Sequence, residues 1–466
     1  MISLQNIRKL LDQSEKDYEK CWKFLSEWKA RQLKVSAEDL LSYQPRLAEA
    51  IFRLGQMTYS LLQERKSLIF RKNSLSPMWF KQRMRRLSGY QKAITEGVNI
   101  GRILGDSFAW MFYQGEREYL RKHFAHQAVL QVPTGLGGKG ELAFISKIRI
   151  WNGQLTIYHG ITSFLRIGDV SFYDPKSKSI TGIGELKTHT DTGSAIGIQL
   201  YLLWSKNSDK FWPQPSETSN VALKALPPKR QQQLNKQLVS MAASLNKPKF
   251  AQVVEIPNET HLHEFRRMMQ GLRRKSFAVE KAGDGLLLIG FRSNRERSLF
   301  GRLLPKTKAD LDKRLIGIEQ HALDIIDMSQ VDASNNSNSI FIGSLDLGAF
   351  PGATPMFWWP LPSDFVRKLV FHEVTVITVY NPAHLVRKLR ASGFEAHLDR
   401  KQLRVTKRIG SSQLKMGNMA HFLQYIQQHL VREDFVLTIF QNILERAEAG
   451  EISLNTRIDL DTQLNY

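Results

Sequence analysis

Two acidic residues and one lysine lie close together in a segment that has the pattern of a β-hairpin. Asp169 lies within one β-type run, LRIGDVSFY, and Glu185 and Lys187 end the next run, after an Asp-Pro turn. Alternate residues of a strand share a face, so Glu185 and Lys187 are predicted to point the same way. If the strands pair symmetrically about Ser177, Asp169 lies directly opposite Glu185, with their Cβ atoms about 5 Å apart. The sequence therefore predicts two carboxylates and a lysine in one place.

The residue types at this hairpin suit the hydrolysis of a phosphodiester. Two facing carboxylates repel each other unless a cation lies between them, and Mg²⁺ or Mn²⁺ prefers oxygen ligands. A metal-bound water can attack phosphorus, while the lysine orients that water and offsets charge on the phosphate. We therefore expect Asp169 and Glu185 to be metal ligands, and Asp169, Glu185 and Lys187 to be catalytic. The alternative is an exposed hairpin with a surface Glu–Lys pair, but the neighbours Ile167 and Phe172 are apolar and favour burial.

The motif resembles that of the PD-(D/E)xK nuclease superfamily. Asp169 matches the first acid, with Gly168 in place of the proline in the name, and Glu185-Leu186-Lys187 matches ExK. The resemblance covers about residues 128–300 and implies a restriction-endonuclease-like core, in which a mixed β-sheet of order α-β-β-β-α-β is flanked by helices. It also implies a metal-dependent endonuclease that hydrolyses DNA, with RNA left open. For large bacterial members it further implies restriction or antiphage defence, at times beside an ATPase partner.

The resemblance implies two more site residues. Glu141, in GKGELAFISKI, matches an acid from the helix before the first strand and would be a third metal ligand, with Glu96 as the second choice. Gln199, in AIGIQLYLLW, resembles a supporting glutamine of some branches, although the tyrosine falls two residues later rather than four. We expect AIGIQLYLLW to be a helix. The glycines of residues 135–140 fit G-x-G-x-x-G, but the next strand lacks the acid of a dinucleotide site, so we expect them to lead into the helix of Glu141.

Hydrophobic periodicity divides the chain into three predicted domains of an α/β (α+β) protein. Residues 1–127 have the helical spacing of an amphipathic bundle. Residues 128–330 hold the β-type runs AVLQV, QLTIYHGI, LRIGDVSFY and ITGIGELK, then a helix at QQQLNKQLVSMAASL and a strand near GLLLIGF, and form the predicted nuclease core. Residues 340–466 are expected to be a small α/β domain, with a β-α-β-β unit and two final helices.

The charge of the chain is strongly positive. Lys and Arg total 66 against 44 Asp and Glu, a formal net charge of +22, which favours binding to polyanions. A solubilising surface, an anionic lipid or an acidic partner would also suit it. The most basic stretch, residues 65–92, has no acid and interleaves aromatic residues, although core aromatics with solvated charges would give the same pattern. The candidate nucleic-acid-binding residues are Arg71, Lys72, Lys81, Arg83, Arg85 and Arg86.

The remaining features of the sequence bear on compartment and function. Cys21 is the single cysteine, so no internal disulfide can form. The first residues form no signal peptide, and no run approaches the roughly 18 apolar residues that span a bilayer, so we expect a cytoplasmic protein without a membrane partner. Two functions are left open: a Mg²⁺-dependent DNA endonuclease, and a catalytically silent nucleic-acid-binding or scaffold subunit of a defence or DNA-processing complex.

Overall fold

The computed structural model describes most of the chain as two compact units. The described residues are 1–30, 36–125, 135–190, 196–205, 211–213, 228–246, 253–254, 259–293, 298–303, 340–345, 347–348, 354–399, 402–410, 412–416, 420–451 and 461–462. Unit 1 comprises Met1–Lys249, Arg297–Pro305 and Gly348–Trp358, and unit 2 comprises Phe250–Glu296, Lys306–Leu347 and Trp359–Tyr466. Helices and antiparallel sheets together confirm the α+β class. The three domain limits expected from the sequence stay a prediction.

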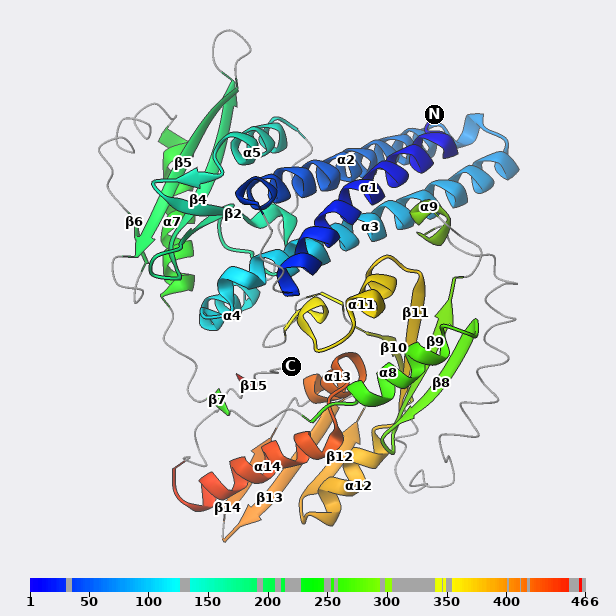
Figure 1. Ribbon diagram of the computed structural model, residues 1–466, viewed down its shortest axis with the longest axis vertical. Coiled ribbons are helices and arrows are strands. Elements are labelled where there is room, and N and C mark those ends of the chain that lie inside the picture. The colour runs from blue at the N-terminus through cyan, green and yellow to red at the C-terminus, as the bar shows by residue number, and fades with distance from the viewer. Residues whose placement is uncertain are drawn as a thin grey trace. The chain divides into compact units, whose positions relative to one another are not determined.

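Long helices make up the first part of unit 1, as predicted (Figure 1). Two of them begin at serine caps, because the Ser3 and Ser36 hydroxyls accept hydrogen bonds from the backbone N–H groups three residues later. Tyr43 stacks on Phe108 in their core, with ring centroids 4.4 Å apart. The elements are α1 (Leu4–Lys29), α2 (Ala37–Phe70), η1 (Lys72–Ser74), α3 (Pro77–Tyr113) and α4 (Arg117–Ala125).

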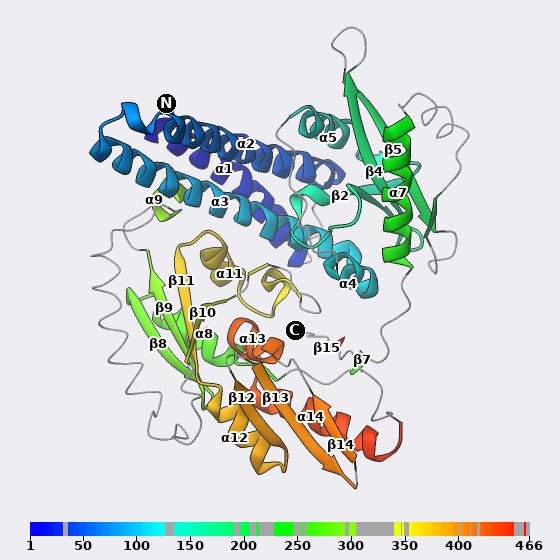
Figure 2. The same cartoon turned by 180° about the vertical axis from the view of Figure 1, so that it is seen from behind.

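A six-stranded sheet completes unit 1, and α7 lies along it (Figure 2). Its strand order is β1-β2-β3-β4-β5-β6. The expectation of a mixed sheet was wrong, because every neighbouring pair is antiparallel. Parallel neighbours need a crossover connection, usually a helix, and no α-helix lies between these strands in the described residues. The elements are α5 (Leu136–Lys147), β1 (Ile150–Trp151), β2 (Gln154–Tyr158), η2 (His159–Ile161), β3 (Val170–Asp174), β4 (Ser179–Thr190), β5 (Ile196–Ser205), β6 (Phe211–Pro213) and α7 (Pro228–Leu245).

The segment AIGIQLYLLW is strand β5, so the helix expected there was also wrong. It pairs with β4 from Thr190↔Ile196 to Gly182↔Trp204. A continuous apolar run has no periodicity that separates a buried strand from a buried helix. The long edge of β4 decides the conformation, because its N–H and C=O groups need partners that a helix cannot supply.

Side chains from the helices bind the edge of the sheet and the loop before β3. The Gln44 amide on α2 donates to Thr156 O (2.7 Å) and accepts from Tyr158 N (2.8 Å), so it pairs with β2 as a neighbouring strand would. Asp106 on α3 accepts from the backbone N–H and the hydroxyl of Ser163, at 2.7 and 2.6 Å. The helical segment is therefore joined to the sheet by buried hydrogen bonds of Gln44, and to the loop before β3 by partly buried ones of Asp106.

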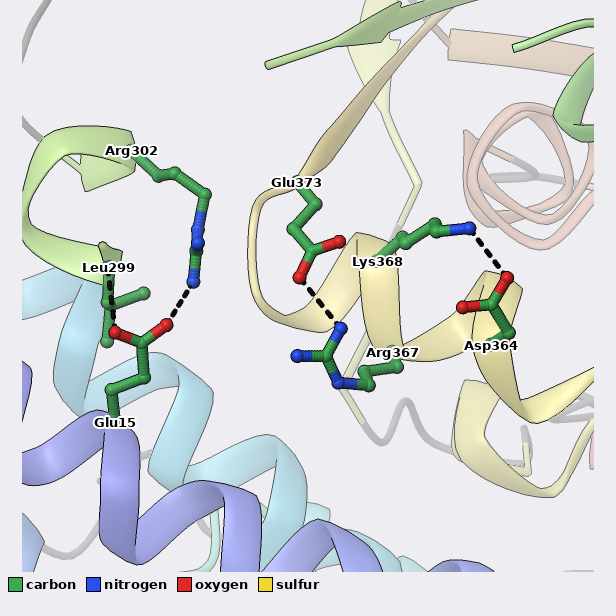
Figure 3. A network of polar contacts seen from close by, with 7 residues as sticks. All are labelled: Glu15, Leu299, Arg302, Asp364, Arg367, Lys368 and Glu373. Carbon is green, nitrogen blue, oxygen red and sulfur yellow. Dashed lines mark hydrogen bonds and ion pairs between the residues drawn. The ribbon is translucent and has the colours of Figure 1, made fainter. Parts of the chain in front are cut away.

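A short helix from later in the chain also belongs to unit 1. Helix α9 (Leu299–Leu303) is held to α1 by Glu15, which accepts from Leu299 N at 2.9 Å and pairs with the guanidinium of Arg302 (Figure 3). A 3-10 helix, η4 (Met356–Trp358), contributes a Trp358 indole N–H that donates to Ser107 O at 2.9 Å. Both contacts bridge positions that are far apart in the sequence.

Unit 2 contains two antiparallel sheets, one parallel pair of short strands (β7 and β15) and helices. The expected strands and helices of residues 374–448 are confirmed, but β11 joins the sheet β10-β11-β9-β8, whereas β12 and β13 join β12-β13-β14. Ion pairs join Arg367 to Glu373 at 2.7 Å and Lys368 to Asp364 at 2.6 Å (Figure 3). Its elements are β7 (Val253–Val254), α8 (Leu262–Gly271), β8 (Phe277–Ala282), β9 (Leu286–Arg292), β10 (Phe341–Ser344), α11 (Ser363–Val370), β11 (Val374–Tyr380), α12 (Ala383–Ala391), β12 (Glu395–Asp399), β13 (Gln402–Ile409), β14 (Ser412–Met416), α13 (Ala420–His429), α14 (Glu433–Glu448) and β15 (Asp461–Thr462). Among the helices of the described residues, none has the length and apolar character needed to cross a membrane.

Candidate active site

The β3–β4 hairpin has the register expected from its sequence. The pairs Val170↔Gly184, Ser171↔Ile183 and Phe172↔Gly182 are those of strands symmetric about Ser177. A bulge after Phe172 shifts the register only nearer the turn. Asp169 lies one residue before β3, and its backbone N–H donates to Gly184 O at 2.8 Å. The hydrogen bonding between the two strands therefore continues as far as Asp169, which lies beside Glu185 in the register.

Asp169 follows a glycine that its backbone conformation requires. Gly168 has φ +71°, and a Cβ atom there would lie 2.9 Å from Gly184 O. Proline is fixed near φ −65°, so the proline of the motif name cannot occupy this position. The turn directs the Asp169 carboxylate to Leu186, whose backbone N–H donates to Oδ2 at 2.7 Å.

Three carboxyl groups interact electrostatically at this end of the hairpin. Burial, together with the neighbouring Glu185 and then Glu141, raises the pKa of Asp169 to about 8. Burial likewise raises the pKa of Glu141 to about 7, with Glu185 adding to the effect, while the Tyr158 hydroxyl that donates to Glu141 acts in the opposite direction. Glu141 on α5 is therefore at the site. Glu96, the second choice, lies on α3, where it accepts from the Asn99 amide at 3.3 Å.

Glu185 and Lys187 share one face of β4, as strand alternation predicted. The Lys187 ammonium donates to Glu185 Oε1 at 2.7 Å. Gln237 on α7 joins them, since its amide donates to Glu185 Oε1 at 2.8 Å and its Oε1 accepts from Lys187 at 3.2 Å. Glu185 is 7% exposed, whereas the Lys187 side chain is 39% exposed. The lysine can therefore meet a ligand from solvent while its partners stay fixed.

Gln199, the glutamine chosen from the sequence, has a different environment. It lies on β5 directly opposite Lys187 in the register and accepts from the Tyr201 hydroxyl at 2.8 Å. The glutamine that reaches the acid and the lysine is Gln237, from the helix correctly predicted at QQQLNKQLVSMAASL. Its signal in the sequence was a run of glutamines on a helix that follows the ExK strand.

Two buried histidines hold the loop that leads to Asp169, and sequence reasoning did not select either. His159 Nδ1 lies 2.9 Å from Gly168 O, and because a carbonyl only accepts, Nδ1 carries the proton. Its Nε2 then accepts from the Ser171 hydroxyl, which accepts in turn from Tyr113. Burial lowers the pKa of His159 to about 4, so the ring is neutral at pH 7. His123 Nδ1 accepts from the backbone N–H groups of residues 166 and 167, each at 3.1 Å.

The three carboxylates at this site are oxygen donors, which is the type of ligand that a divalent cation such as Mg²⁺ prefers. Within the described ranges no group of three or more His, Cys, Asp or Glu side chains is already arranged to hold a metal. Instead each carboxylate has a protein donor: Tyr158 for Glu141, the backbone of residue 186 for Asp169, and Lys187 for Glu185. Mg²⁺ keeps several waters and needs one or two carboxylates, and a bound cation would favour the charged form of Asp169, whose pKa is raised by burial and by the two glutamates.

The candidate nucleic-acid-binding residues lie around the turn between α2 and α3. Arg83 is held in an ion pair with Glu64, and it also donates to Ile2 O at 2.8 Å. Its guanidinium therefore has a structural role. Tyr90 is buried, whereas Phe70 is 92% exposed. The exposed basic candidates are Arg71, Lys72, Lys81, Arg85 and Arg86.

Comparisons with known proteins assign no function to this site. Family models, curated proteins and solved structures give no match to the chain. The superfamily expected from the motif therefore stays a prediction.

Proposed function

We propose that unit 1 is a divalent-metal-dependent phosphodiesterase, an endonuclease of the PD-(D/E)xK type that cleaves DNA. The observation that carries this proposal is the gathering of Asp169, Glu185 and Glu141 beside Lys187, with the pKa of Asp169 raised to about 8 by burial and by the two glutamates. Such perturbed carboxyl groups mark sites that bind cations or transfer protons.

Each side chain has a role that follows from its contacts. Asp169 and Glu185, with Glu141, would hold Mg²⁺ or Mn²⁺, which supplies an acidified water and stabilises charge on the phosphate. Lys187 orients the nucleophilic water and offsets charge on the phosphate, because its ammonium is partly exposed. Gln237 is a positioning residue, since it bonds both Glu185 and Lys187.

The order of elements and the charge support the same proposal. The chain runs α5-β1-β2-β3-β4-β5-β6-α7, so it contains an α-β-β-β-α series in α5, β2, β3, β4 and α7, with the short strand β1 before β2 and the β5–β6 pair before α7 as additions. The net charge of +22 suits a polyanionic substrate. DNA as substrate, a cytoplasmic role in restriction or antiphage defence, and an ATPase partner come from the resemblance of the motif and belong to the proposal.

Cleavage of supercoiled plasmid and of single-stranded DNA with Mg²⁺ tests the assignment. We expect Lys187→Ala to lower the rate by about 100-fold or more, which is the loss found when one charge-stabilising group is removed. The matched control is Lys176→Ala, in the exposed turn of the same hairpin, which should cleave like the parent. Equal activity of the Lys187 and Lys176 variants would show that Lys187 has no catalytic role.

A second candidate function is a catalytically silent nucleic-acid-binding or scaffold subunit. The observation that favours it is that Lys187 and Glu185 already neutralise each other at 2.7 Å. Metal binding distinguishes the two functions. A nuclease should gain thermal stability from Mg²⁺ or Mn²⁺, and Asp169→Asn should abolish that gain, whereas a silent subunit should show no gain.

A further inference from the structure

The turn between α2 and α3 gathers exposed apolar and basic side chains at one end of the helical hairpin. It lies at the opposite end of α3 from α4 (Figure 1). Ile69, Phe70, Met78 and Trp79 are 56%, 92%, 73% and 39% exposed. We call this surface the α2–α3 tip and define it by Lys66, Ile69, Phe70, Arg71, Lys72, Met78, Trp79, Lys81, Arg85 and Arg86.

The charge of the tip has one sign. No acid occurs between Glu64 and Glu96, and Glu64 is paired with Arg83. On α3, Met78, Lys81 and Arg85 are spaced by three and four residues, so they form one exposed stripe. On α2, Lys66 and Phe70 are neighbours by the same spacing. The surface thus alternates cations with apolar groups.

We propose that the α2–α3 tip binds single-stranded nucleic acid, with Phe70 stacked on an unpaired base and the neighbouring cations on the flanking phosphates. Aromatic side chains stack on any base, and Lys and Arg follow the backbone. A duplex buries its base faces against each other, so it offers Phe70 no partner without unstacking. Arg71, Arg85 and Arg86 supply guanidinium groups, which bind phosphate in a bidentate manner.

The choice of a polynucleotide over an anionic membrane rests on the proposed function, because the same unit carries the candidate phosphodiesterase site. The tip is not part of that site. Gln44, which contacts β2, and Phe70 are separated by 26 residues of one continuous helix, and a rise of 1.5 Å per residue places them roughly 40 Å apart. The tip would hold a strand at a distance from the position where it is cut.

Binding can be measured without cleavage. The full chain carrying Lys187→Ala, in EDTA, is titrated against labelled oligothymidine and oligouridine of about 20 nucleotides, longer than common site sizes, and against a duplex of equal length. We expect Phe70→Ala to weaken binding of single strands by about 10-fold and to change duplex binding less than about twofold, while Phe70→Trp keeps the affinity. The thymidine and uridine arms show whether the polymer is DNA or RNA.

The charged part of the tip has its own readout. Replacing Arg71 and Lys72 together by glutamine should reduce the slope of log affinity against log salt by about 1.4, since each phosphate contact to a single strand contributes about 0.7. The matched controls are Ile342→Ala, an exposed apolar residue of unit 2, and the double change of Lys9 and Lys16 to glutamine on α1. Both should bind like the parent.

Two results would overturn the proposal. One is single-strand binding by the Phe70→Ala variant with the affinity of the parent. The other is binding to vesicles of phosphatidylserine and phosphatidylcholine that requires Phe70 and that oligonucleotides do not compete, which would assign the tip to a membrane. An unchanged melting temperature shows that the exposed substitutions leave the fold intact. Because no metal is present, loss of nuclease activity and loss of tip binding are separate outcomes.

Discussion

Replacing Asp169 by asparagine should stabilise the metal-free protein. Asparagine keeps an oxygen that can accept from Leu186 N, and it is neutral beside Glu185 and Glu141 without having to take up a proton. The pKa of Asp169 is raised from 3.8 to about 8, so folding takes up a proton between these values, and this group makes the protein less stable as pH rises through that window.

The size of the effect follows from the same values. At pH 7 an unfolded aspartate lies about three pH units above its ordinary pKa, and each unit is worth about 1.4 kcal/mol. Keeping Asp169 protonated in the folded state therefore costs at most about 4 kcal/mol at pH 7. Asp169→Asn should recover up to that amount, which raises the thermal midpoint by up to about 4 °C in a protein of this size.

Calorimetry of the full chain in EDTA at pH 5, 7 and 8 measures this effect. The gap between parent and variant should widen with pH. Asp174→Asn is the matched control at the other end of β3, where backbone hydrogen bonding by Lys176 lowers the pKa of the carboxyl, so its effect should be constant from pH 5 to 8. If parent and Asp169→Asn respond equally to pH, burial and the neighbouring glutamates do not raise the pKa of Asp169. With Mg²⁺ at about 100 times its Kd the parent should gain about 2.7 kcal/mol, and the variant none.

Three further changes test the surroundings of the site. Gln237→Ala should lower the cleavage rate by about 10-fold, because the variant loses the hydrogen bonds to Glu185 and Lys187. Gln199→Ala should retain most activity. A larger loss in the Gln199 variant than in the Gln237 variant would show that Gln199 is the supporting glutamine. Gly140→Ala should destabilise the fold by about 1–3 kcal/mol in urea unfolding, because its Cβ would lie 2.2 Å from Thr188 Oγ1, and adding Thr188→Ala should recover part of the loss. His159→Phe should raise the Km for Mg²⁺ while circular dichroism stays native, and an unchanged Km would show that its hydrogen bonds do not position the loop.

Local patterns were enough to predict the elements that carry their own periodicity. The helices α1 to α3 follow from spaced apolar residues, and the register of β3 and β4 follows from alternation and a turn. The clustering of Asp169, Glu141 and Lys187 was also expected, and the pKa shifts of the two acids show that they interact. Whether these residues catalyse hydrolysis stays a prediction.

What could not be predicted depends on partners that are distant in the sequence. The conformation of β5 was set by the free edge of β4 and not by its own apolar run. Gln237 and Glu185 are 52 residues apart in the sequence, so no local spacing predicts their hydrogen bond. His159 and Tyr113 reach Ser171 from 12 and 58 residues away, and such buried polar chains have no periodic signal.

The amide of Gln44 has a consequence for anyone who wishes to cut this protein into parts. This side chain forms hydrogen bonds with the backbone of β2 that a neighbouring strand would otherwise form. The backbone groups of β2 therefore depend on a helix residue more than a hundred positions upstream. A fragment of residues 128–330 would expose Thr156 O and Tyr158 N together with an apolar surface, and an open strand edge of this kind invites association with other chains. The helical segment is therefore part of the structural unit that completes this sheet, and removing it would leave the strand edge open.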